Sequence, residues 1–165
     1  MGKSNKKRAR TAMMDPIPPA EQVVIGMMRT GWAIESRLDK FFSSWGITLL
    51  QYNVLRICYV RDPDGTGIPS GTIGASVMRL VPDVSRLIDR LVKAGFLERL
   101  PAPDDRRVVL ILLTQKGHEL VEKVHGPLLE HNRKLLEHMS EPEQQKLANG
   151  MVRAMEGPLS RRTDD

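Results

Sequence analysis

Residues 82–99 read PDVSRLIDRLVKAGFLER, and this stretch decides the fold. Pro82 suits the first turn of a helix, where its missing N–H costs nothing, and Gly95 suits the exit, where φ must be positive. At about 100° per residue, apolar side chains fall on one side of this predicted helix and polar, mostly basic ones on the other. The inner set is Val84, Leu87, Ile88 and Leu91, and the outer set is Arg86, Asp89, Arg90 and Lys93.

A hairpin follows this helix and a shorter helix precedes it. Residues 96–100 and 108–113 are strand-like runs joined by PAPDDRR, a polar segment that ends in Arg106 and Arg107. Upstream, Ser70 can cap a brief helix through about Arg79, with Ile73, Val77 and Leu80 facing inward. Two short helices and a hairpin in this order predict a winged helix-turn-helix, whose second helix is sized for the major groove.

Longer helices are predicted on both sides of this region. One runs from Ala20 to the stop at Gly46, and a second begins at a capping box of Thr48 and Gln51 and ends before the breaker at 62–65. After the hairpin, Thr114 can cap a helix to about His138, which Gly126-Pro127 should bend. Ser140 and Glu143 repeat the capping-box pattern before a last helix through Met155. The predicted fold class is mainly α with a small β-hairpin wing.

Charge, cysteine content and hydropathy restrict the class of protein. The basic segment 1–19 carries four of the five net positive charges, and residues 20–165 hold 20 basic and 19 acidic side chains. We expect this tail to be disordered, and either to add weak phosphate contacts or to serve solubility. The lone Cys58 excludes an intramolecular disulfide, and no apolar run is long enough for a membrane span or secretory signal. We therefore expect a cytoplasmic protein without membrane contact.

Four stretches resemble the MarR family of winged helix-turn-helix transcriptional regulators, over roughly residues 20–157. They are ITLLQYNVLR at 47–56, the stretch 82–99, Asp105-Arg106-Arg107, and LTQKG at 113–117. The resemblance implies that double-stranded DNA is the partner, that Asp105 orients the wing, that Arg107 enters the minor groove and that Arg106 meets phosphate. The family's usual Glu-Leu-Ala run is replaced here by Thr72-Ile73-Gly74, where glycine costs about 1 kcal/mol of helix stability relative to alanine.

The predicted DNA contacts lie on the two short helices and the wing. They are Ser70, Thr72, Pro82, Asp83, Ser85, Arg86, Arg90, Lys93, Arg106 and Arg107. The alternative interpretation is that such arginines only form a solvated helix face and do not contact DNA. Asp89 is expected to form local salt bridges rather than to read a base, and Asp83 can simply favour the helix dipole.

The resemblance also implies a homodimer. Residues 47–113 would form the DNA-binding lobe, residues 20–46 and 114–157 the dimerisation helices, and residues 158–165 a C-terminal tail. The predicted C-terminal helices have more apolar side chains than one small domain can cover. These are Leu120, Val121, Val124, Leu128, Leu135, Leu136 and Met139. A two-fold dimer predicts a pseudo-palindromic operator with half-sites about 10 bp apart.

By resemblance the protein is a repressor that a small molecule of unknown identity releases from DNA, and no cofactor is expected. The ligand cleft would lie between the DNA-binding lobe and the dimerisation helices. Trp32, Tyr52 and Arg56 are candidate lining residues, although both aromatics also suit an ordinary core or interface.

The residues also leave three alternatives open and exclude a fourth. Cys58 can be an oxidation sensor or a small buried hydrophobe, and the second is favoured because Cys58 lies mid-helix between Ile57 and Tyr59, where a thiol usually packs as a small hydrophobe. His118, Glu122 and His125 share a helical face and can bind a metal, but no fourth ligand is identifiable. A protein-interaction module that has lost DNA binding is disfavoured by the basic wing. Catalysis is excluded because no nucleophile with its base, phosphate loop or carboxylate pair occurs at a recognisable spacing.

Overall fold

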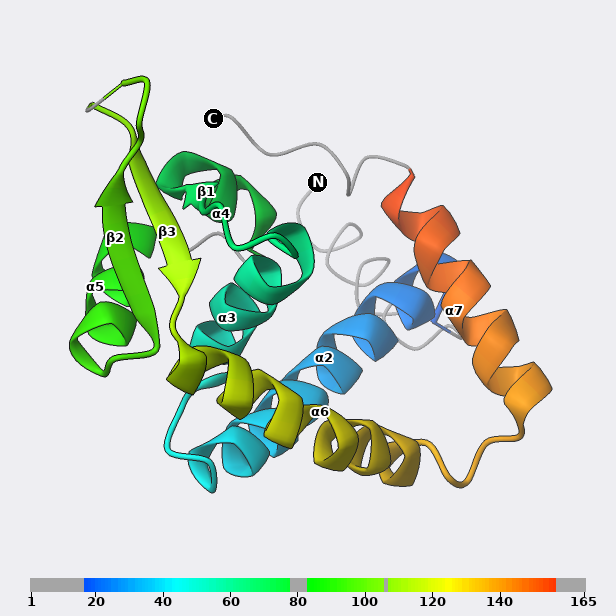
Figure 1. The fold of residues 1–165 in the computed structure, drawn as a ribbon. Coiled ribbons are helices and arrows are strands. Elements are labelled where there is room, and N and C mark those ends of the chain that lie inside the picture. The colour runs from blue at the N-terminus through cyan, green and yellow to red at the C-terminus, as the bar shows by residue number, and fades with distance from the viewer. Residues whose placement is uncertain (1–16, 78–82, 106, 157–165) are drawn as a thin grey trace, which may run out of the picture. The chain divides into compact units, whose positions relative to one another are not determined.

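The computed structural model describes residues 17–77, 83–105 and 107–156 and confirms the predicted fold class: it is mainly helical with one small antiparallel sheet (Figure 1). Its elements are α2 (Pro19–Ser43), α3 (Leu49–Arg61), β1 (Ile68–Pro69), α4 (Ser70–Ser76), α5 (Val84–Lys93), β2 (Leu97–Pro101), β3 (Val109–Leu113), α6 (Gln115–Leu135) and α7 (Glu141–Met155). The predicted tail at 1–16, Leu80, Pro82, Arg106 and the C-terminal tail lie outside the described residues.

The chain divides into two compact units at a boundary inside α3, after Val54. In the first unit α2 ends close to its predicted stop, and Gly46 has the positive φ, 72°, that the turn requires. The Thr48–Gln51 capping box is confirmed: the Thr48 N–H donates to Gln51 Oε1 at 2.8 Å and the Gln51 N–H donates to Thr48 Oγ1 at 3.2 Å. The buried rings of Phe42 and Tyr52 pack with their centroids 4.8 Å apart.

The second unit packs α3, α4, α5 and the start of α6 around the sheet. Its fully buried side chains are Leu55, Cys58, Ile73, Ile88, Leu91, Leu97, Ile111 and Val124. The predicted inner face of α5 is confirmed, since Leu87, Ile88 and Leu91 are buried. Each fully buried aliphatic side chain of this kind contributes about 1.5–3 kcal/mol to folding. The apolar spacing of α5 therefore decides which of its faces stays in solvent.

The predicted hairpin is one part of a three-stranded sheet, because β1 pairs with β3 on the side away from β2. The turn before β1 depends on the buried carboxylate of Asp62, which accepts hydrogen bonds from the backbone N–H groups of Thr66 and Gly67, both at 2.8 Å. Gly67 has φ +90°, and a Cβ there would lie 2.9 Å from Leu110 Cβ. The sequence predicts no strand at Ile68, since two residues are too few to show strand periodicity.

Two predicted helix starts are wrong. Helix α4 has Pro69 at its N-cap position and no side-chain cap, so Ser70 is its first residue rather than its cap, and it ends at Ser76 instead of near Arg79. Helix α5 begins at Val84 with Asp83 as its N-cap, so it starts two residues later than predicted. Serine and proline near a helix start are each compatible with several cap positions, which explains both shifts. The inward placement of Ile73 and Val77 is confirmed.

The C-terminal helices start at their predicted caps. Thr114 Oγ1 accepts a hydrogen bond from the Gly117 N–H at 3.1 Å, and α6 continues through Pro127 but ends at Leu135, three residues short of His138. Ser140 and Glu143 form the predicted capping box of α7. No residue of α7 is buried in this single chain.

The start of α6 is hydrogen-bonded to the turn that ends α5 and packs closely against it. The Thr114 hydroxyl donates to the Gly95 carbonyl at 2.7 Å, and Lys116 Nζ donates to the Ala94 carbonyl at 2.7 Å. Gly95 has φ +76°, as predicted. A Cβ on Gly117 would overlap the carbonyl oxygen of Phe96 and lie 2.6 Å from Leu113 Cδ2, so only glycine fits there. The LTQKG stretch thus fixes the C-terminal end of α5.

We expect Gly117→Ala to lower the free energy of unfolding by about 1–3 kcal/mol, because backbone atoms must move to admit the methyl group. Thermal denaturation measures this as a fall of about 2–4 °C per kcal/mol. Gly74→Ala is the control, since a Cβ there lies 3.8 Å from Val84 Cγ2, an ordinary contact. It should leave stability unchanged or raise it by up to about 1 kcal/mol. Equal melting temperatures for wild type and Gly117→Ala would contradict the close approach.

Candidate nucleic-acid interface

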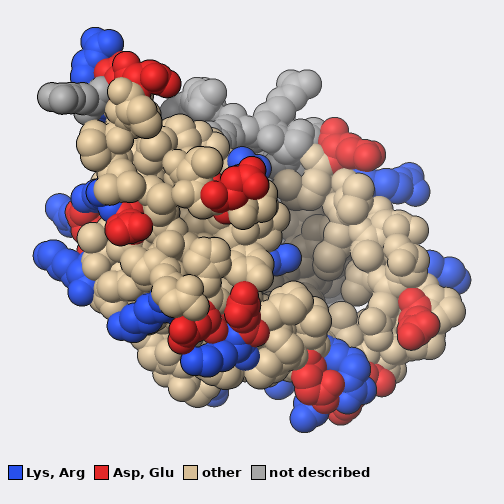
Figure 2. Space-filling model, in the orientation of Figure 1, with Lys and Arg blue, Asp and Glu red and all other residues tan. Residues whose placement is uncertain are grey.

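The polar face of α5 lies in solvent. Ser85, Arg86, Arg90 and Lys93 are all exposed, whereas the opposite face is in the core. Figure 2 shows Lys and Arg side chains along the edge that α5 forms and again at the wing tip, with acidic side chains among them. A helix about 10–12 Å across with this basic face fits the width of a DNA major groove, about 12 Å.

Asp83 organises the start of α5. Its Oδ1 accepts a hydrogen bond from the Arg86 N–H at 2.9 Å, and its Oδ2 lies 2.7 Å from Arg86 Nε. The carboxylate therefore caps the helix and forms an ion pair with a side chain of the exposed face. A negative charge at this position also interacts favourably with the helix dipole, as the sequence suggested.

Asp89 has a different partner. Its Oδ1 lies 2.6 Å from Arg99 Nη1, so an ion pair joins α5 to β2: Asp89 forms a salt bridge as expected, but with a residue of the following strand rather than a local one. Arg99 was not predicted to be this partner. Its only signal was its charge within the strand-like run 96–100, which does not identify a partner. Both side chains are about two-fifths exposed, so the pair orients α5 more than it stabilises the fold.

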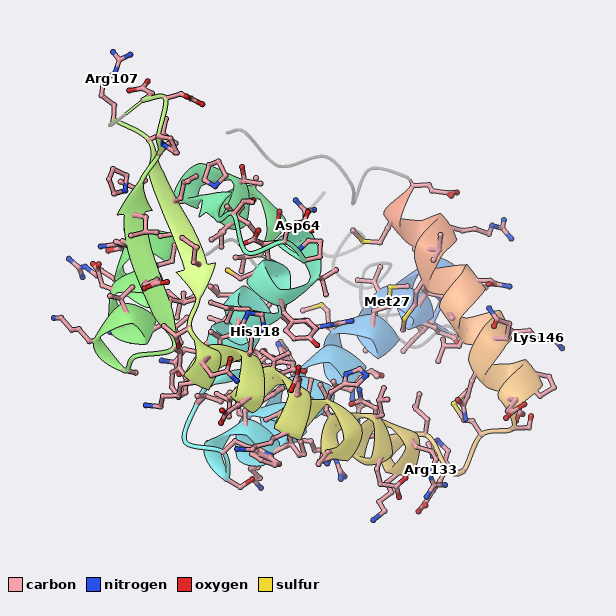
Figure 3. The ribbon with its side chains drawn as sticks, viewed as in Figure 1. Met27, Asp64, Arg107, His118, Arg133 and Lys146 are labelled. Carbon is pink, nitrogen blue, oxygen red and sulfur yellow. The ribbon has the colours of Figure 1, made fainter. Side chains whose placement is uncertain are left out.

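At the wing tip, Asp105 holds Arg107. The Arg107 N–H and Nε donate to Asp105 Oδ1 at 3.0 and 3.1 Å, and Nη2 donates to Oδ2 at 3.1 Å. These bonds from Arg107 keep the pKa of the Asp105 carboxyl below its ordinary value. The Arg107 side chain is 90% exposed and lies at the far end of the hairpin, away from the helices of its unit (Figure 3).

The remaining predicted contacts lie near these residues. Thr72 is exposed on α4 and Ser70 is half-buried at its first turn. Pro82 and Arg106 lie outside the described residues. The structure thus presents Arg86, Arg90 and Lys93 together on α5, with Arg107 on the separate wing of the same unit.

The histidine cluster has other partners. The Tyr59 hydroxyl donates to Glu122 Oε1 at 3.3 Å, and the rings of Tyr59 and His118 lie with their centroids 5.5 Å apart. Among residues 17–77, 83–105 and 107–156, no three His, Cys, Asp or Glu side chains are grouped so that they could hold a metal ion. Tyr59 thus contacts two of the three residues on which the metal alternative depends.

The Cys58 thiol lies in the core, with 1% of the residue exposed. Burial, aided by the nearby negative charge of Asp62, raises the pKa of this thiol from 9.0 to about 12. Since the thiolate is the reactive form, the environment opposes the oxidation-sensor alternative.

We expect the native thiol to react with Ellman's reagent at pH 8 at least about 100-fold more slowly than the thiol of the urea-unfolded chain, because little thiolate forms. The raised pKa also predicts that the free energy of unfolding falls as pH rises from 9.0 toward 12, since the unfolded chain ionises first. Cys58→Ser should remove the labelling. Rapid labelling of the folded protein would restore the sensor alternative.

The candidate ligand residues differ in environment. Trp32 is 64% exposed and lines a shallow hollow of about 440 Å³ on α2 together with Glu35, Ser36, Asp39 and Lys40. Tyr52 is a buried core aromatic, as the alternative interpretation holds, and Arg56 is exposed. In the described part of the chain, no helix is both long and apolar enough to cross a membrane.

Helices α4 and α5 with the β2–β3 wing make this chain a winged helix-turn-helix protein. The sequence model of the MarR family matches residues 47–109. The HTH-type transcriptional regulator PecS of Dickeya dadantii is 34% identical over 126 residues, which cover 76% of this chain and 75% of PecS. The chain therefore belongs to the MarR family.

Other relatives agree with this assignment. MarR of Escherichia coli is 34% identical over 94 residues, which cover 53% of this chain and 58% of that protein. The reduced form of E. coli MarR superposes with a TM-score of 0.66 at 25% identity and covers 86% of this chain and 98% of MarR. S. aureus MepR in its DNA complex shares the fold, with a TM-score of 0.71 at 22% identity over 81% of this chain and 96% of MepR.

Proposed function

We propose that this chain is a DNA-binding transcriptional regulator that places α5 in the major groove and its wing in the minor groove. The observation that carries the proposal is the pair of exposed arginines, Arg86 on α5 and Arg107 on the wing, each restrained by a nearby aspartate. The relative PecS is named as an HTH-type transcriptional regulator. The relative MarR is named as a multiple antibiotic resistance protein. A cysteine-to-serine mutant of E. coli MarR, 25% identical to this chain with a TM-score of 0.68, has been solved with operator DNA.

In this proposal each part of the surface has its own role. Arg86 and Arg90 contact base edges, since an arginine fork matches guanine O6 and N7. Lys93 at the end of α5, and Ser85, Thr72 and Ser70 around its start, contact phosphates and set the register. Arg107 enters the minor groove, and Pro82 and Arg106 remain predicted contacts.

We also propose a homodimer, because two helices have apolar faces that this single chain leaves in solvent. On α2 the exposed apolar side chains include Val23, Val24, Met28 and Trp32, and on α7 they are Leu147, Met151, Val152 and Met155. Apolar surface of this extent is unusual in a monomer. A two-fold pair of chains that packs through the apolar faces of the helices within residues 20–46 and 114–157 would present two copies of α5 to half-sites about 10 bp apart.

The regulatory mode that fits is repression in the cytoplasm, relieved by a small molecule. A dimer on an operator that overlaps a promoter excludes polymerase. A ligand that binds one spacing of the two α5 helices better than another shifts the dimer off the operator. Trp32, which lines the open hollow on α2, is the candidate ligand contact. Tyr52 is a core residue, so it would contribute by packing rather than by contact with the ligand.

Light scattering tests the dimer. We expect the wild type to have twice the mass of one chain and Met151→Glu to shift the population toward monomer, because a carboxylate would be buried in an apolar interface. Lys146→Gln on the same helix changes the net charge by the same amount at an exposed polar position, and it should remain a dimer (Figure 3). A monomeric wild type would contradict the proposal.

Gel-shift titration tests DNA binding. With DNA from upstream of its own gene, non-specific competitor and a stated salt concentration, we expect competitor-resistant binding by the wild type. Arg107→Ala should weaken it by about 5- to 150-fold without loss of the dimer, Arg86→Ala should also change sequence preference, and the Arg106→Ala/Arg107→Ala variant should lose binding.

Arg133→Ala is the matched control for these arginine variants. This residue is paired with Glu130 near the end of α6, and its replacement removes the same charge away from α5 and the wing. It should bind as the wild type does. Dimer loss in Arg107→Ala would contradict the wing assignment, and binding no better than competitor at several upstream regions would favour a protein-interaction module.

A further inference from the structure

We propose that Asp83 is a positioning residue that makes Arg86 a reader of base sequence rather than a general contact for phosphate. The proposal rests on the DNA-binding function above and concerns the same surface. It assigns to the acidic N-cap of the recognition helix a role in discriminating between DNA sequences.

The carboxylate of Asp83 makes two contacts with Arg86. Oδ1 of Asp83 accepts from the backbone N–H of Arg86 at 2.9 Å, and Oδ2 lies 2.7 Å from Arg86 Nε. The first contact ties the carboxylate to the first turn of α5, so the second fixes the guanidinium relative to the helix axis. The side chain of Arg86 is nevertheless 80% exposed. It is restrained and still accessible to DNA.

This restraint lowers the cost of specific binding. A free arginine side chain carries about 2 kcal/mol of rotamer entropy, part of which is lost when it binds a base. The ion pair with Asp83 removes some of that freedom beforehand. It involves Nε, whereas the two terminal nitrogens belong to the fork that reaches O6 and N7 of guanine.

The charge of Asp83 acts in the same direction. If Arg86 bound a phosphate, Asp83 would be brought toward the negatively charged backbone, and the repulsion would weaken that contact. A base edge carries no net charge, so the same carboxylate costs little there. Asp83 thus weakens a contact between Arg86 and phosphate but does not weaken a contact between Arg86 and a base edge.

Asp89 provides an internal comparison. It has the same charge and lies within the same helix, but its partner is Arg99 of β2, at 2.6 Å. Asp89 therefore holds the helix against the sheet, whereas Asp83 holds a side chain of the exposed face. Removal of either carboxylate raises the local positive charge equally, but only one removal releases Arg86.

The experiment begins with selection of duplexes from a random library by the wild-type protein. Affinities for the enriched duplex, for its single base-pair substitutions and for an unrelated duplex are then measured by fluorescence anisotropy at about 0.15 M salt. Asp83→Asn is the test variant, since asparagine also caps helices but carries no charge. Asp89→Asn is the matched control.

We expect both variants to bind the unrelated duplex about 2- to 5-fold more tightly, because each loses one negative charge. Only Asp83→Asn should lose discrimination, by about 5-fold or more, at the base pair whose preference Arg86→Ala abolishes. Combining Asp83→Asn with Arg86→Ala should cause no further loss at that base pair.

Unchanged discrimination by a folded Asp83→Asn protein, with the melting temperature of the wild type, would overturn the positioning role. A loss spread evenly over all base pairs would overturn it as well, because it would indicate a loosened helix. Failure of the wild type to enrich any duplex would instead overturn the DNA-binding function itself.

Discussion

The contact between the start of α6 and the turn that ends α5 is the constraint on which the second unit depends. Thr114, Lys116 and Gly117 engage three successive residues, Ala94 to Phe96, by three hydrogen bonds and a close backbone approach. Lys116 also lies over the Phe96 ring, 4.5 Å from its centroid, where a cation is attracted by the ring face. This contact fixes the end of the recognition helix relative to the sheet, and the Asp89–Arg99 pair fixes its middle.

The features that the sequence predicted well are local or periodic. The buried face of α5, the positive φ of Gly95 and the capping boxes at Thr48 and Ser140 each depend on residues within one or two turns. The errors at Ser70 and position 82 are shifts of one or two residues at helix starts, where several local solutions have similar free energies. Family resemblance added Asp105 and Arg107, whose pairing the structure shows but whose relation to DNA remains a proposal.

The features that the sequence could not reveal are formed across the chain. Strand β1 exists because β3 has an open edge, and its two residues carry no pattern of their own. Asp62 is buried because its turn must bring Gly67 against Leu110, and Arg99 finds Asp89 only when β2 lies beside α5. Such pairings require knowledge of the packing, so a list of charged residues does not distinguish Asp62, Asp83 and Asp89, although their roles differ.

The distribution of acidic residues also explains how a nearly neutral domain can recognise DNA. Residues 20–165 hold 20 basic and 19 acidic side chains, so long-range attraction to DNA is weak, and at physiological salt screening limits it to about 8 Å. Affinity must then come from contacts at short range, where Arg86 and Arg107 each have an aspartate beside them. In the function proposed above, these pairs reduce the attraction to phosphate at random sites and favour sequences that fit both grooves. One chain with so little electrostatic attraction to DNA would bind weakly. This is a physical reason for the proposed dimer, because two DNA-binding surfaces on one operator together supply the affinity that one surface lacks.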